Sequence, residues 1–112
     1  MNAITLQCVA EYSGAWESLT IQKQFKDGYE PIAVATPTEQ NDVEVVTTYP
    51  NITYLISETA SSITMTLNIE PFRCIDLTNY TCTMVHPTVV SRTTANINGK
   101  IRLWFSFNIV LV

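Results

Sequence analysis

Hydrophobic and polar residues alternate along much of this chain, which is the pattern of half-buried strands in an antiparallel sheet. The clearest example is residues 63–70, where Ile, Met, Leu and Ile alternate with Thr, Thr, Asn and Glu. The same period of two predicts strands at residues 5–11 and 79–84. Shorter runs predict weaker strands at residues 19–25, 32–35, 43–48 and 52–56.

Turn-forming residues separate these runs. Residues 26–28 (Lys-Asp-Gly) and 96–99 (Asn-Ile-Asn-Gly) predict hairpin turns, and residues 37–42 and 49–51 predict polar breaks. No segment predicts a helix longer than a turn. The spacing of about eight short strands predicts an all-β antiparallel sandwich or barrel.

The most apolar part of the chain is its last run. Every second residue from Ile101 to Leu111 is apolar, which favours a long terminal strand. The run is shorter than the roughly 20 apolar residues of a membrane helix. The beginning of a membrane or lipid anchor remains the alternative.

Composition limits the chain to a single domain, residues 1–112, which we expect to be a fragment of a longer extracellular protein. With 46% hydrophobic and 14% charged residues, the chain can bury a core. The net charge is −4 and the basic residues are scattered, which argues against nucleic-acid binding and against a polybasic membrane-binding segment.

Motifs for catalysis or cofactor binding are absent from the sequence. There is no Gly-rich phosphate loop, no nucleophile elbow and no H-E-x-x-H, and His86 is the only histidine. We interpret His86 as a residue at the rim of a loop. We therefore predict that the chain is not an enzyme and binds no cofactor or metal. Convergence of His86, an acid and Cys74 in a cleft would reverse this prediction.

The cysteine count favours one disulfide and one remaining thiol. Cys8, Cys74 and Cys82 form no CxxC pair, and their spacing does not support a zinc site with His86.

Two N-glycosylation sequons point to the secretory pathway when they are taken together with a disulfide. Their acceptors are Asn51, in Asn-Ile-Thr, and Asn79, in Asn-Tyr-Thr. We expect an extracellular or cell-surface location.

Residues 76–82, Asp-Leu-Thr-Asn-Tyr-Thr-Cys, resemble the D-x-x-x-Y-x-C motif that leads into strand F of immunoglobulin superfamily domains. Upstream, residues 61–69 resemble strand E, and residues 6–8 (Leu-Gln-Cys) resemble strand B. The resemblance covers nearly the whole chain. It implies an all-β, immunoglobulin-like antiparallel β-sandwich with Greek-key topology.

The resemblance also assigns structural roles. It implies a tyrosine corner at Asp76 and Tyr80, and an inter-sheet disulfide between Cys8 and Cys82. Cys74 is then the odd thiol. It is a buried free thiol, a bridge to another domain or chain, or the partner of Cys82 in place of Cys8.

The chain departs from the family pattern at three places. Strand C of the family carries a core tryptophan, but the corresponding position in this chain is near Ile21. Trp16 comes too early for that position and falls in the B–C loop. Little sequence precedes Cys8, so strand A is short or missing. The long distance from Cys82 to the last strand implies a large F–G loop or an extended F–G ribbon, with the apolar end as strand G.

Room for extra strands between residues 32 and 48 suggests a variable-like or intermediate set. The aliphatic strand C is similar to that of some invertebrate immunoglobulin domains, including those of molluscan fibrinogen-related lectins.

The B–C loop and the F–G segment are expected at the same end of the sandwich. Tyr12, Trp16 and His86 are the candidate partner-binding residues there, because Tyr and Trp are frequent interface anchors. The alternative is that Trp16 folds back to cap the core. Glycans on Asn51 and Asn79, at other surfaces, would leave this end open.

We therefore predict an extracellular protein-recognition module in cell adhesion or a cell-surface receptor, with a homophilic or heterophilic protein partner. Homophilic pairing through a sheet face is one expected mode, and attachment to a membrane through further C-terminal sequence is another expectation. The alternatives are a secreted immune-defence module of the molluscan lectin type and a structural spacer domain.

Overall fold

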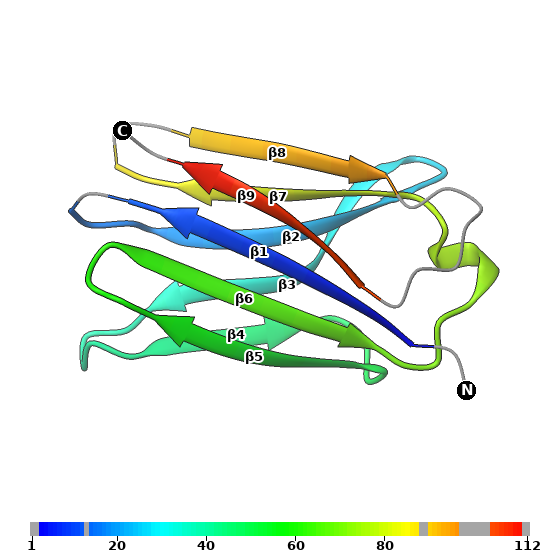
Figure 1. The fold of residues 1–112 in the computed structure, drawn as a ribbon, viewed down its shortest axis with the longest axis horizontal. Coiled ribbons are helices and arrows are strands. Elements are labelled where there is room, and N and C mark those ends of the chain that lie inside the picture. Colours follow the sequence, from blue (N-terminus) through cyan, green and yellow to red (C-terminus); the bar gives the residue numbers. More distant parts are fainter. Residues whose placement is uncertain (1–2, 13, 88–89, 97–103, 111–112) are drawn as a thin grey trace.

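The chain folds into nine β-strands that form two stacked sheets (Figure 1). The structure is a computed structural model, and it describes residues 3–12, 14–87, 90–96 and 104–110. The strands are β1 (Ile4–Glu11), β2 (Ser18–Phe25), β3 (Gly28–Pro37), β4 (Val43–Thr47), β5 (Ile52–Glu58), β6 (Ser62–Ile69), β7 (Asn79–Val85), β8 (Val90–Asn96) and β9 (Trp104–Val110).

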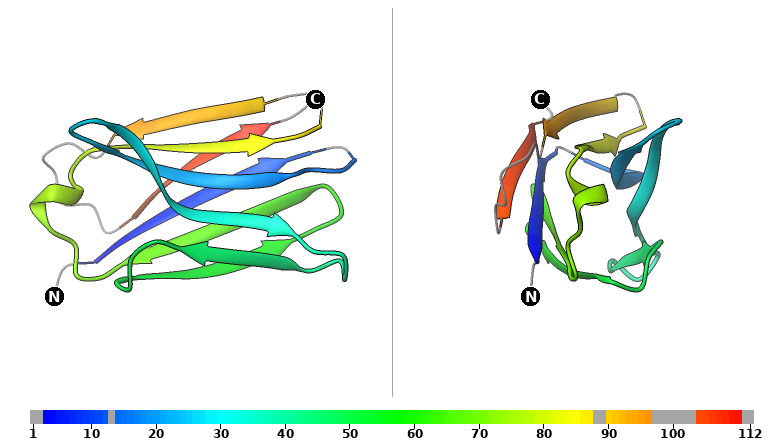
Figure 2. Two further views of the ribbon diagram at one scale, coloured as in Figure 1. Left: turned by 180° about the vertical axis from the view of Figure 1, so that it is seen from behind. Right: turned by 90° about the vertical axis from the view of Figure 1, so that its right-hand side faces the viewer.

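The strand order explains the two layers seen in Figure 2. One sheet has the order β5-β6-β1-β9, and the other has the order β4-β3-β2-β7-β8. All pairs are antiparallel except β1 with β9, which run parallel. The predicted all-β sandwich is confirmed.

The core lies between the sheets, and it is built from the apolar positions of the alternating strands. On β1 and β6 every second residue is buried, since successive side chains of a strand point to opposite faces. The buried residues of these two strands are Ile4, Leu6, Cys8, Ala10, Ile63, Met65, Leu67 and Ile69. The predicted strand positions therefore also identified the core-facing residues.

The predicted hairpin at residues 26–28 is confirmed. Phe25 pairs with Gly28, which leaves Lys26 and Asp27 as a two-residue loop between β2 and β3. Gly28 has φ of +128°, a conformation that side chains rarely adopt, so a glycine is required there. The second predicted hairpin, residues 96–99, lies beyond Asn96 outside the described residues.

The prediction for the C-terminal run is wrong about its neighbour. We expected that run to be strand G beside strand F, but β8 pairs with β7 in that place and forms an extended ribbon. The run instead forms β9, which pairs with β1. Because β8 already pairs with β7, the terminal strand cannot take that place, and it adds to the free edge of β1 instead.

Helical structure is limited to a single turn in the described part of the chain. This 3₁₀ turn, η1 (Cys74–Asp76), lies in the connection from β6 to β7. Among the described residues, no helix has the length and apolarity needed to cross a membrane.

Candidate functional site

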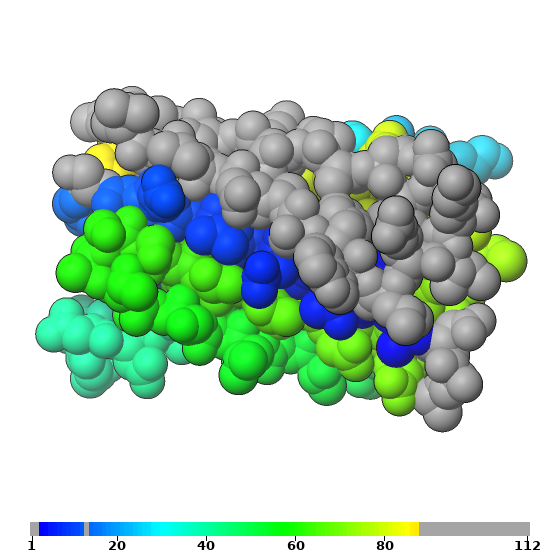
Figure 3. Space-filling model, in the orientation of Figure 1, coloured from blue at the N-terminus to red at the C-terminus, as the bar shows by residue number. Residues whose placement is uncertain are grey.

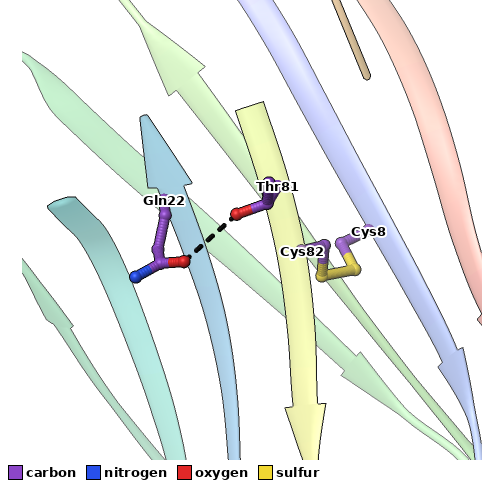
Figure 4. The surroundings of a disulfide bond; sticks show 4 residues. All are labelled: Cys8, Gln22, Thr81 and Cys82. Atoms are coloured by element: carbon purple, nitrogen blue, oxygen red, sulfur yellow. Dashed lines mark hydrogen bonds between the residues drawn. A yellow bond between two sulfur atoms is a disulfide. The ribbon is translucent and has the colours of Figure 1, made fainter. Parts of the chain in front are cut away.

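The two sheets are joined by a disulfide between Cys8 on β1 and Cys82 on β7 (Figure 4). Both cysteines are fully buried, and their Cα atoms are 6.4 Å apart. This confirms the predicted pairing. Cys74 is free and exposed, so the interpretations of it as a buried thiol and as the partner of Cys82 are both wrong.

Tyr80 forms the hydrogen bond of a tyrosine corner. Its ring is fully buried, and its hydroxyl donates to the backbone oxygen of Asp76 at 2.8 Å. Burial raises the pKa of this hydroxyl far above its usual range, and the nearby Asp76 carboxylate adds to the effect. The bond ties the start of β7 to the β6–β7 connection.

A buried ion pair lies beside this corner, and the sequence analysis did not predict it. The ammonium group of Lys23 on β2 contacts the Asp76 carboxylate, and the two residues are only 7% and 6% exposed. The second carboxylate oxygen accepts the backbone N–H of Arg73 at 2.9 Å. The alternation of the strand could have indicated the burial of Lys23, because Lys23 lies on the same face of β2 as the buried Leu19 and Ile21.

The end that carries the β1–β2 loop does not present Trp16 as an anchor. Trp16 is only 7% exposed and belongs to the hydrophobic core, as the alternative interpretation of a core cap expected. Its ring lies 6.1 Å from that of Tyr12, which is half-buried and donates from its hydroxyl to the backbone oxygen of Thr59 at 3.4 Å. We therefore remove Trp16 from the candidate contact surface.

The expected proximity of the β1–β2 and β7–β8 connections is present. A Cβ atom placed on Gly14 would lie 4.0 Å from Nε2 of His86, which is half-buried. The described residues contain no group of three or more His, Cys, Asp or Glu side chains suited to a metal ion. Among the described residues, this end therefore brings two connections together but forms no metal-ligating group.

The large exposed apolar side chains lie elsewhere, and a first group is found on the edge strands β4 and β5. Val46 is 60% exposed, Tyr54 51% and Leu55 69%. The sheet that contains β5 is seen from its outer side in Figure 3, where the green β6 separates β5 from the blue β1. The sequence signal was the adjacent pair Tyr54-Leu55, which interrupts the alternation and places apolar side chains on both faces of one strand.

The outer face of the five-stranded sheet contains two nearly buried threonines on β7 that differ in hydrogen bonding. Thr81 donates its hydroxyl to Oε1 of Gln22 at 3.2 Å (Figure 4). The Thr83 hydroxyl is buried and has no hydrogen-bond partner among the described residues. A buried hydroxyl without a partner destabilises the folded state, because it loses its hydration.

Replacing Thr83 with Val should therefore raise the free energy of unfolding by about 1 kcal/mol, since Val keeps the shape and removes the unsatisfied group. Urea unfolding followed by tryptophan fluorescence measures the change. The matched control is Thr81→Val, which removes a satisfied hydroxyl and should lower stability instead. Equal changes in stability for the two substitutions would show that the Thr83 hydroxyl is not an unsatisfied buried group.

The two sequons occupy the end of the sandwich opposite the β1–β2 loop, where β5 and β7 both begin (Figure 1). Asn51 immediately precedes β5 and donates weakly from Nδ2 to the backbone oxygen of Pro71 at 3.4 Å. Asn79 is the first residue of β7, and its Nδ2 donates to Oε1 of Gln24 at 2.8 Å. Glycosylation of either residue stays a prediction.

Comparisons with known proteins identify the fold. No family model and no curated protein matches the chain. One similar solved structure comes from work on the multimeric cell-adhesive interactions of VGSC beta subunits. The match has a TM-score of 0.64 and 16% identity, and it covers 98% of this chain and 84% of that chain. With the inter-sheet disulfide, it defines this chain as an immunoglobulin-like β-sandwich domain.

Proposed function

We propose that this domain is an extracellular protein-recognition module of the cell-adhesion type, and that it pairs with a second copy through the edge of β5. The internal disulfide is typical of proteins in oxidising compartments outside the cytosol. The structurally similar VGSC beta subunit takes part in multimeric cell-adhesive interactions, according to its description. Attachment to a cell surface through further sequence is part of this proposal.

The observation that carries the proposal is the unprotected edge of β5. This strand lies at the end of its sheet order, so the backbone groups on its outer side have no partner strand in that sheet. Natural proteins usually protect such edges with lysine, proline or a bulge. β5 contains none of these, and its single charged residue is Glu58 at the last position.

The side chains of β5 are also suited to a contact. Tyr54 and Leu55 are both more than half exposed, and their register partners on β6 are Leu67 and Thr66. Leu67 is buried, so Tyr54 lies on the inner side of the edge and Leu55 on the outer side. A strand added at this edge would cover apolar surface on both sides.

Two copies can pair here without repulsion between their charges. In a two-fold antiparallel arrangement centred on Leu55, Glu58 of each copy stands opposite Ile52 of the other. The two carboxylates are then on the order of 20 Å apart along the ribbon. That distance exceeds the screening length of about 8 Å at physiological salt.

The strand arrangement supports the variable-like set within the immunoglobulin class. β3 and β4 extend the sheet beyond β2, as the extra strands of variable-type domains do. The molluscan resemblance stays a prediction, because no comparison bears on it.

Replacing Leu55 with Lys should abolish self-association, because it places a charge on the pairing edge. The measurement is sedimentation equilibrium over a wide concentration range, in a Cys74→Ser background that excludes disulfide-linked dimers. We expect a reversible monomer–dimer equilibrium for Cys74→Ser alone and a monomer for the double variant.

Ile75→Lys is the matched control, since Ile75 is 67% exposed and Leu55 is 69% exposed, but Ile75 lies in η1. It should leave the dimer intact. A parent protein that remains monomeric at all concentrations would exclude homophilic pairing. A dimer that persists in the Leu55→Lys variant would exclude the β5 edge.

A further inference from the structure

A second group of exposed apolar side chains surrounds a pocket at the end of the sandwich where the sequons lie. The pocket has a volume of about 230 Å³. Its lining includes the buried Ile32, Ile52 and Ile69, and it also includes Tyr49 and Ile75, which are 38% and 67% exposed. The volume is below the roughly 300–1,000 Å³ of pockets for drug-sized ligands, so the pocket suits one small ring.

Asn51 is itself part of the pocket wall, and a turn sets its position. The backbone N–H of Ile52 donates to the oxygen of Tyr49 at 3.2 Å, which closes a β-turn with Pro50 and Asn51 as its central residues. Tyr49 and Asn51 therefore project from the same short turn and line the same pocket. Asn51, Ile52 and Thr53 form the first sequon, and Thr53 is exposed.

We propose that Asn51 carries an N-linked glycan, and that its first N-acetylglucosamine lies against Tyr49 and Ile75 and covers this pocket. The inference rests on the extracellular location in the proposed function, because the glycan is added in the secretory pathway. Nδ2 of Asn51 bonds to C1 of the sugar, while the bond from C1 to the diphosphate of a lipid-linked oligosaccharide donor breaks. The amide loses one proton, and the lipid diphosphate leaves.

The local hydrogen bonding allows this attachment. The Asn51 amide has two N–H groups, and the bond to the sugar replaces one of them. The remaining N–H can keep its hydrogen bond to the backbone oxygen of Pro71, now 3.4 Å from Nδ2. That bond would hold the first sugar beside the pocket and limit its freedom of rotation.

The chemistry of the pocket matches that of the sugar. One face of a pyranose ring exposes C–H groups, which pack on the electron-rich face of an aromatic ring such as that of Tyr49. The N-acetyl carbonyl is an acceptor, and the exposed Arg73 at the pocket supplies guanidinium donors. Covering Ile75 and Tyr49 in this way removes apolar surface from water.

Asn79 provides an internal comparison. Its Nδ2 donates to Gln24, and the hydroxyl of its sequon threonine, Thr81, belongs to a residue that is only 3% exposed. Asn79 is not among the residues that line this pocket. A glycan at Asn79 should therefore project from the fold without the same effect on stability.

The test uses the full chain, secreted from a eukaryotic host and trimmed enzymatically to one N-acetylglucosamine per site. Glycopeptide mass spectrometry establishes occupancy, and thermal unfolding is measured in the monomeric Leu55→Lys background, so that loss of self-association has no influence. Thr53→Ala removes the first sequon and keeps Asn51. We expect this substitution to lower the Tm by about 4 °C. Thr81→Ala removes the second sequon, and its effect on the Tm is measured in both glycosylated and unglycosylated protein. The difference between the two effects isolates the contribution of the sugar on Asn79.

Tyr49→Ala tests the contact itself, with Tyr29→Ala as the matched control because both tyrosines are 38% exposed. In Tyr49→Ala protein, Thr53→Ala should no longer change the Tm, whereas in Tyr29→Ala protein its full effect should remain. A bare Asn51 would overturn the proposal, and so would additive effects of Tyr49→Ala and Thr53→Ala. Neither outcome affects the dimerisation measured for the proposed function.

Discussion

Replacing both Cys8 and Cys82 with Ala should lower the free energy of unfolding by about 4–5 kcal/mol. The bond closes a loop with a sequence separation of 74 residues, and cross-linking so long a loop removes much conformational entropy from the unfolded chain. A domain of this kind has a total stability of about 5–15 kcal/mol. The double variant should therefore lie near the limit of folding, as measured by urea unfolding.

The experiment requires a Cys74→Ser background, because the exposed Cys74 thiol can attack the Cys8–Cys82 disulfide of an unfolded parent chain and exchange with it. Cys74→Ser alone is the control and should change stability by less than about 0.5 kcal/mol, as exposed substitutions usually do. A loss below about 1 kcal/mol in the double variant would contradict the dominant role that we assign to the disulfide.

Replacing Asp76 with Asn should lower the free energy of unfolding by about 3–5 kcal/mol, because it leaves the charge of Lys23 buried without its partner. Both residues are more than nine-tenths buried, and they are 53 positions apart in the sequence. Asn retains a side-chain oxygen that can accept the backbone N–H of Arg73, so the substitution mainly removes charge. Chemical unfolding at neutral pH measures the loss.

The double variant Lys23→Met, Asp76→Asn separates charge from packing. It removes both charges and keeps an apolar chain at position 23, next to the Phe25 ring that lies 5.2 Å from the Lys23 ammonium. Replacing both members of a buried pair is often close to neutral, so it should recover more than half of the lost stability. Equal losses in the single and double variants would show that the ion pair is not the cause.

Much of the fold was predictable from local patterns. The period of two identified the strands and their buried faces, since side chains alternate across a strand whatever its neighbours are. The D-x-x-x-Y-x-C resemblance located the cysteine pair and Tyr80, whose hydroxyl bonds to the backbone four residues upstream at Asp76. Relations that span only a few residues can be predicted directly from the sequence.

The candidate sites were less predictable, because exposure depends on which layer covers a side chain. Trp16 looked like an interface anchor, but the sandwich buries it. Tyr54 and Leu55 looked like ordinary strand residues, but β5 is an edge and leaves them exposed. The partner of Lys23 comes from a distant connection, which the spacing of charges along the chain does not indicate.

The sequence by itself determined that this protein is an all-β, disulfide-linked sandwich, because alternation and the cysteine motif act over a few residues. The tertiary structure alone decided the neighbours of each strand, including the place of β9 beside β1 and the open edge at β5. Strand order is settled by competition among distant segments for the same backbone hydrogen bonds and apolar surface. That competition determines which residues remain accessible to a partner.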